Sequence, residues 1–134
     1  MDRKKAREYA FTILFQYKFR PDDISAVLSD FFLEHDAGNQ GEYIGSVVAG
    51  VVKNIEEIDK KIEEFSRVWT VDRMDSVNLA ALRLGVYEML YMDDIPLAVT
   101  ISEAATLARR FAGEEAAAFV NGVLGGIQKQ LEAL

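Results

Sequence analysis

The sequence predicts an all-α domain of about seven helices, without a sheet, and three observations support this fold class. Apolar residues recur three and four positions apart along most of the 134-residue chain, which is the spacing of one helical face. The pattern breaks where helices are expected to end, at Pro21 and Pro96. Half of the residues are hydrophobic and 28% are charged, a composition typical of a folded globular protein.

The first predicted helix runs from near Ala6 to Pro21 and carries two apolar stripes. One stripe contains Tyr9, Ala10, Ile13, Leu14 and Tyr17, and the other contains Phe11, Phe15 and Phe19. A helix with two apolar faces is either sandwiched in the core or faces a partner. We expect the first stripe in the core, whereas Phe15 and Phe19 fit either place.

The middle of the chain predicts a second helix, a loop, and then one long helix or two. Asp22 or Asp23 can cap the second helix, whose expected inward residues are Ile24, Val27, Leu28, Phe31 and Phe32. The composition of residues 38–41 (GNQG) is typical of a loop. Helical spacing continues over residues 42–67, with a break expected near Asn54. Two lysines and no His lie between the glutamates at 56, 57, 63 and 64, which indicates a solvated face and not a metal site.

The C-terminal part predicts three more helices. Asp75 is the expected N-cap of the first, and Pro96 follows its end. Residues 97–99 should be extended, because Thr100 and Glu103 have the spacing of a capping box. The expected buried stripe of that helix is Ile101, Ala104, Ala105, Ala108 and Phe111. Gly113 should end it, and Gly122 and Gly126 should allow a close helix approach in the last helix.

Composition also excludes several function classes. The chain has no Cys, so disulfides, thiolate metal sites and cysteine catalysis are excluded. A single His argues against a Ser-His triad or a multi-His metal site. No apolar run approaches the roughly 18 residues of a membrane span, and the charged N-terminus does not resemble a secretion signal. We therefore expect a cytoplasmic protein without catalysis, cofactor or metal.

Charge is distributed unevenly along the chain. Residues 1–20 contain six basic and two acidic side chains, whereas the other 114 residues contain nine basic and 20 acidic ones. A basic start on an acidic body is typical of an arm that binds a polyanion. A solvated helix start is the alternative. Cations in a first helical turn oppose the helix dipole, and a ligand phosphate would remove that conflict.

Five stretches in this order resemble the NusB family of bacterial transcription antitermination factors over nearly the whole chain. They are residues 4–10 (KKAREYA), 69–73 (WTVDR), 82–89 (LRLGVYEM), 95–104 (IPLAVTISEA) and 119–124 (FVNGVL), the last being the most specific. The resemblance implies one NusB-like domain with two packed helical subdomains, at about 1–66 and 67–134. It also implies a protein without catalysis that binds boxA RNA of nascent ribosomal RNA transcripts together with NusE, a small-subunit ribosomal protein. The pair would help RNA polymerase read through terminators.

The resemblance also assigns site residues. The RNA-binding residues would be Arg3, Lys4, Lys5, Arg7, Phe15, Glu115, Ala118 and Phe119. The face towards NusE would include Asn78, Arg83 and Tyr87. From the residues alone, Arg83 could instead pair with a carboxylate such as Glu88 or Glu103. The basic arm is expected to be exposed, so that replacing Arg3 and Arg7 by Ala should weaken RNA binding and leave stability nearly unchanged.

This sequence departs from the family pattern at Ser102, at Asn78 and in the lysines of the basic cluster, which lack the bidentate geometry of arginine. Two other functions are compatible with the chain. One is an RNA-binding module that serves a separate ribosomal-RNA-modifying enzyme subunit. The other is a homodimer formed through the two-faced first helix, which would hide the RNA site.

Overall fold

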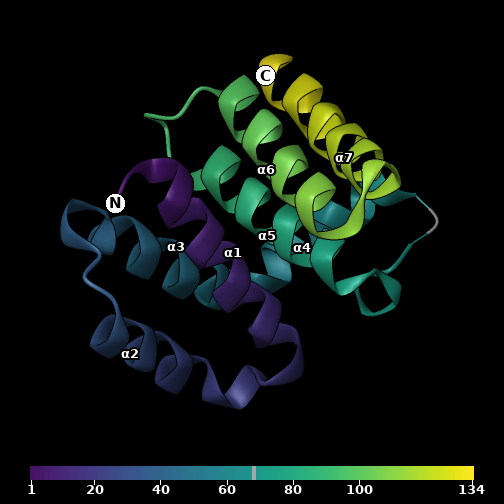
Figure 1. Cartoon of the computed structure of the whole chain (residues 1–134). Coiled ribbons are helices and arrows are strands. Elements are labelled where there is room, and N and C mark those ends of the chain that lie inside the picture. The colour runs from purple at the N-terminus through teal and green to yellow at the C-terminus, as the bar shows by residue number, and fades with distance from the viewer. Residues whose placement is uncertain (68) are drawn as a thin grey trace.

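The computed structural model describes residues 1–67 and 69–134, and within them it contains α-helices, short 3₁₀ helices and no strand (Figure 1). This confirms the all-α prediction and the number of helices. The seven α-helices are α1 (Arg3–Phe19), α2 (Ile24–Glu34), α3 (Gly41–Lys53), α4 (Ile55–Ser66), α5 (Ser76–Tyr91), α6 (Leu97–Ala112) and α7 (Glu114–Glu132). The 3₁₀ helices are η1 (Pro21–Asp23), η2 (Gly38–Gln40) and η3 (Val71–Arg73).

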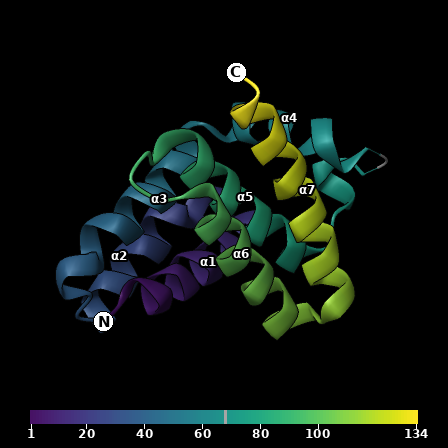
Figure 2. The ribbon, with the colours of Figure 1, turned by 90° about the horizontal axis from the view of Figure 1, so that it is seen from above.

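Helix α5 is the centre of the fold, because it packs against α1, α3, α4, α6 and α7. All residues from Leu79 to Val86 are buried, as expected of a helix that is surrounded on every side. In Figure 2, α1, α2 and α3 lie on one side of α5, and α4 and α7 lie on the other. The division into two subdomains near residue 66 stays a prediction.

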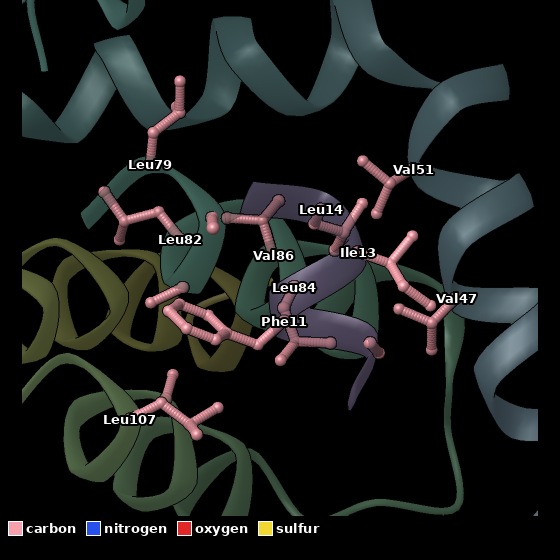
Figure 3. Packing of buried hydrophobic residues seen from close by; sticks show 14 of the residues in the cluster. Phe11, Ile13, Leu14, Val47, Val51, Leu79, Leu82, Leu84, Val86 and Leu107 are labelled. Carbon is pink, nitrogen blue, oxygen red and sulfur yellow. The ribbon is translucent and has the colours of Figure 1, made fainter. Parts of the chain in front are cut away.

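The hydrophobic core joins residues from both halves of the chain. Figure 3 shows Phe11 and Leu14 of α1 beside Val86 and Leu84 of α5, with Leu107 of α6 nearby. The two stripes of α1 do not separate into an inner and an outer face. Phe11 is buried with Leu14, whereas Phe15 is half-buried and Phe19 is exposed.

Several helix boundaries agree with the sequence. The carboxylate of Asp75 accepts hydrogen bonds from the backbone N–H groups of Val77 and Asn78, as an N-cap should. Asn54 separates α3 from α4. Gly113 follows α6 with a φ of 96°, a conformation that favours glycine. These ends are local in the sequence, so the residues that cause them could be identified there.

The predicted start of α6 is wrong. Residues 97–99 are helical and not extended, since α6 begins directly after Pro96. Thr100 is therefore inside the helix and does not cap it. Its hydroxyl instead donates a hydrogen bond to Glu88 at 2.7 Å. Thr100 therefore serves as a hydrogen-bond donor to the buried carboxylate of Glu88 and not as part of a capping box.

Other local predictions also need correction. Residues 38–41 form η2 and the first residue of α3 and not an irregular loop. Phe32 and Phe111 were predicted to face inward, but both are exposed. Gly122 has no atom within 4 Å of the position where a Cβ would lie, so it permits no close helix approach. Gly126 does, because a Cβ there would lie 2.7 Å from the ring of Phe65.

Candidate nucleic-acid interface

Arg3 is held against η2 and the start of α3 by two contacts. Its Nε donates a hydrogen bond to the side chain of Gln40 at 2.7 Å. Its guanidinium carbon lies 4.2 Å from the centre of the Tyr43 ring, within the range of a cation–π contact. The side chain is half-buried. The cation is therefore positioned at the surface by the fold and does not extend freely into solvent.

Lys4 and Lys5 are exposed, as predicted, and both have acidic neighbours. The side chain of Lys4 is 71% exposed, and its Nζ lies 3.6 Å from the carboxylate of Glu103 on α6. Lys5 donates a hydrogen bond to Glu8 at 3.2 Å. Burial opposes ionisation of Glu8, but hydrogen bonds from Lys5 and Arg110 outweigh it and lower the pKa of this carboxyl. Glu8 is therefore a carboxylate at neutral pH.

Arg7 contradicts the prediction of a wholly exposed basic arm. Its side chain is 7% exposed and forms two hydrogen bonds, at 2.8 and 3.2 Å, to the fully buried carboxylate of Glu88 on α5. Tyr43 and Thr100 donate their hydroxyls to the same carboxylate. The guanidinium thus has a structural role inside the protein and is not presented to a ligand.

The buried cluster affects the ionisation of its members. Burial opposes the charge of Arg7, yet the hydrogen bond and the charge of Glu88 outweigh this effect and raise the pKa of the guanidinium. Burial, and then the negative charge of Glu88, raise the pKa of the Tyr43 phenol far above its ordinary value. Arg7 therefore stays charged and Tyr43 stays neutral at any physiological pH.

A surface groove of about 400 Å³ brings together two segments that are distant in the sequence. The segment from Trp69 into the first turn of α5 contributes Trp69, Arg73 and Asn78, and the start of α7 contributes Glu115 and Phe119. Trp69 is 48% exposed. The side-chain oxygen of Asn78 is buried without a hydrogen-bond partner among the described residues. The groove thus combines aromatic surface, one cation and several hydrogen-bonding groups.

Of the residues assigned to the NusE face, Asn78 lies in this groove with Glu115 and Phe119, which were assigned to RNA. Ala118 is exposed on α7 beside Phe119 but does not line the groove. The groove could not be found from helical periodicity, because its residues come from separate elements. The only sequence signal for Trp69 was its place in the 69–73 stretch.

Phe15 is connected to the groove indirectly. Its ring lies 5.5 Å from that of Phe19, so the two aromatic residues form one surface at the end of α1. From the same turn of the helix, Lys18 donates hydrogen bonds to the backbone oxygen of Met74 and to Ser76. Met74 lines the groove. Lys18 therefore ties the end of α1 to the groove.

Arg83 and Tyr87 lie elsewhere on α5 and are mainly involved in packing. Arg83 is buried and forms two hydrogen bonds, at 2.9 and 2.8 Å, to Asp59 on α4. The expected pairing with a carboxylate is present, but the partner is neither Glu88 nor Glu103. Tyr87 packs so closely on Gly50 that a Cβ there would lie 2.1 Å from its ring.

Two negative findings apply to residues 1–67 and 69–134. No group of three or more His, Cys, Asp or Glu side chains is placed to hold a metal ion. None of the helices combines the length and the apolar character that a bilayer crossing requires.

Comparison with known proteins identifies the family. The model of the NusB family matches residues 4–129. The chain belongs to the NusB family. It is 42% identical over 125 residues to the transcription antitermination protein NusB of Thermoanaerobacter sp. (strain X514), covering 93% of this chain and 89% of the relative. The corresponding protein of Acetivibrio thermocellus is 43% identical over 130 residues, which cover 96% and 90% of the two chains.

Solved NusB structures have the same fold. NusB of T. maritima superposes with a TM-score of 0.87 at 34% identity, over 96% of this chain and 92% of that chain. A crystal structure of the antitermination factors NusB and NusE in complex with double-stranded RNA matches with a TM-score of 0.81 at 32% identity. That match covers 96% of each chain. The chain therefore has the whole NusB fold, as its sequence predicted.

Proposed function

We propose that this protein binds the boxA segment of nascent ribosomal RNA transcripts together with NusE and acts there in transcription antitermination. The main support is its likeness, over 96% of each chain, to a NusB chain from a complex of NusB, NusE and RNA. In this proposal the protein acts by binding, within the RNA polymerase antitermination complex, and not by catalysis.

The basic start of α1 is the proposed contact to the RNA backbone. Arg3, Lys4 and Lys5 have exposed or half-buried side chains, and phosphates are their natural partners. Arg7 is not included among the contacts because its guanidinium is buried and paired with Glu88. Its proposed role is to hold the first turn of α1 in place, so that the three cations next to it keep their positions.

The groove is the proposed contact to RNA bases. Single-stranded RNA is commonly recognised by bases stacked on aromatic side chains. Trp69 and Phe119 provide such surfaces, and Asn78 and Glu115 can form hydrogen bonds to base edges. Phe15 and Phe19 form an aromatic surface at the end of α1. Lys18 connects this end of the helix to Met74, which lines the groove. Ala118 would border the RNA without obstructing it.

The proposed NusE surface involves α5 and α4. Asn78 lies at its border with the RNA groove, and Tyr87 remains partly accessible. Arg83 would stiffen this surface through Asp59 more than contact the partner directly, since its side chain is 10% exposed. The acidic character of the chain outside residues 1–20 is suited to a basic ribosomal protein.

The test is an RNA-binding titration with a boxA-type RNA and a scrambled RNA of the same length, with and without NusE, at two salt concentrations. We expect binding that NusE strengthens, that the scrambled RNA does not reproduce, and that salt weakens as phosphate contacts require. Equal binding of both RNAs, or no binding under any condition, would contradict the proposed function.

A further inference from the structure

Helices α1 and α6 lie beside each other in the same direction, as three contacts show. Lys4 is near Glu103, Glu8 is paired with Arg110, and the ring of Phe11 lies 5.3 Å from that of Phe111 at an interplanar angle of 24°. The N-terminal basic residues therefore share one face with the C-terminal end of α6. The sequence predicts no site residue at that end of α6.

Arg110 and Phe111 have the features of an RNA contact. The side chain of Arg110 is 58% exposed, and its guanidinium carbon lies 5.0 Å from the centre of the Phe111 ring. Phe111 was expected in the core, but 43% of it is exposed. A guanidinium beside an exposed ring offers a bidentate partner for a phosphate and a stacking surface for a base.

Three cations on this face, Lys4, Lys5 and Arg110, are already paired with carboxylates within the protein. Glu103 neutralises Lys4, and Glu8 receives hydrogen bonds from both Lys5 and Arg110. Glu8 therefore holds one cation from the predicted RNA-binding start of α1 and one from α6. A phosphate that binds Arg110 through Nη1 must replace the carboxylate of Glu8.

We propose that Arg110 and Phe111 form an additional contact to single-stranded RNA, and that Glu8 occupies Arg110 until an RNA phosphate displaces it. This inference rests on the proposed function and extends its RNA surface from α1 onto α6. A phosphodiester carries the same single charge as the carboxylate, so the exchange is nearly balanced. An RNA that makes this contact alone would gain little binding free energy from it. An RNA that also contacts the groove and the start of α1 would stay bound. Glu8 thereby favours the specific RNA over others.

The first test compares Arg110→Ala with Arg109→Ala, which removes the same charge from the adjacent position. Arg109 pairs with Glu114 and lines a different groove, between α6 and α7. We expect Arg110→Ala to lower the affinity for boxA-type RNA about fivefold. It should also reduce the slope of log affinity against log salt by about 0.7. Arg109→Ala should change the affinity by less than about twofold and leave the salt slope unchanged. Equal effects of the two variants would overturn the inference.

The second test compares Glu8→Gln with Glu114→Gln, two isosteric changes that remove one negative charge each. We expect Glu8→Gln to strengthen RNA binding about two- to fivefold at low salt, with the greater relative gain for a scrambled RNA. Glu114→Gln should have no such effect, because its partner Arg109 lies outside the proposed contact. Unchanged or weaker binding by Glu8→Gln would overturn the role of Glu8.

Thermal unfolding of each variant shows whether the protein is intact, and Glu8→Gln remains decisive if an arginine variant does not fold. The outcomes also separate the two proposals. If the unmodified protein binds no boxA-type RNA with NusE present, the proposed function fails and this inference fails with it. If it binds normally and Arg110→Ala binds equally well, only this inference fails.

Discussion

The guanidinium of Arg7 and the carboxylate of Glu88 form a buried ion pair that joins α1 to α5 across 81 positions of sequence. Tyr43 from α3 and Thr100 from α6 complete the hydrogen bonding of the carboxylate. Four helices thus meet at one charged group. A buried charge is tolerated only when it is paired and hydrogen-bonded, so each of these contacts depends on the others.

We expect Arg7→Ala to destabilise the protein by about 3–5 kcal/mol, because it leaves the carboxylate of Glu88 buried without its cation. Urea unfolding measures this change. Lys4→Ala is the matched control, since it removes a cation from the same helix but at an exposed position, and it should change stability by no more than about 0.5 kcal/mol. Equal stability of the two variants would contradict the role of the buried pair.

Tyr43 predicts a specific dependence of stability on alkaline pH. The unfolded chain ionises a tyrosine at a pKa of about 10, whereas burial and Glu88 raise the pKa of Tyr43 in the folded protein. The stabilising contribution of Tyr43 is therefore complete below about pH 10. It is lost as the pH rises towards the folded-state pKa, because only the unfolded state releases the proton.

The measurement is urea unfolding of the unmodified protein and of Tyr43→Phe at neutral and alkaline pH. At neutral pH the variant should be less stable by about 1–3 kcal/mol, since Glu88 loses a hydrogen bond. Above pH 10 its stability should fall less steeply than that of the unmodified protein. Burial and the hydrogen bond to Glu57 raise the pKa of Tyr91 to about 12, but this contribution is present in both proteins and cancels. Parallel pH profiles would contradict the prediction.

Gly50 and Gly122 predict opposite responses to the same substitution. A Cβ at Gly50 would lie 2.1 Å from the ring of Tyr87, so Gly50→Ala should destabilise the protein by about 1–3 kcal/mol. Gly122 lies on an open helical surface, so Gly122→Ala should raise stability by up to about 1 kcal/mol through helix propensity. Thermal unfolding of both variants tests the pair. Destabilisation by Gly122→Ala would indicate packing that the structure does not contain.

Trp69 tests the base-binding part of the proposed interface. Because about half of its surface is exposed in the groove, Trp69→Ala should weaken RNA binding by about 1–3 kcal/mol with little change in the melting temperature. Phe32→Ala removes another exposed aromatic side chain, on α2, and should leave RNA affinity unchanged. An equal loss of RNA affinity in both variants would remove the groove from the interface.

The helices could be predicted because helical periodicity and caps such as Asp75 are local features of the sequence. The role of Arg7 could not, since its basic neighbours indicated an arm and its partner Glu88 is distant in the chain. Phe111 illustrates the same limit. Its spacing matched the buried stripe, but it lies at the end of α6 where little covers it. The groove was also beyond local patterns, because two segments that are distant in the sequence build it.

The most direct test of the account is in vitro transcription through a terminator placed downstream of a boxA sequence, with RNA polymerase, the other Nus factors and NusE present. We predict that adding this protein increases read-through, and that a scrambled boxA abolishes the increase. Read-through that does not respond to the protein, or that rises equally on the scrambled template, would contradict a boxA-dependent antitermination function.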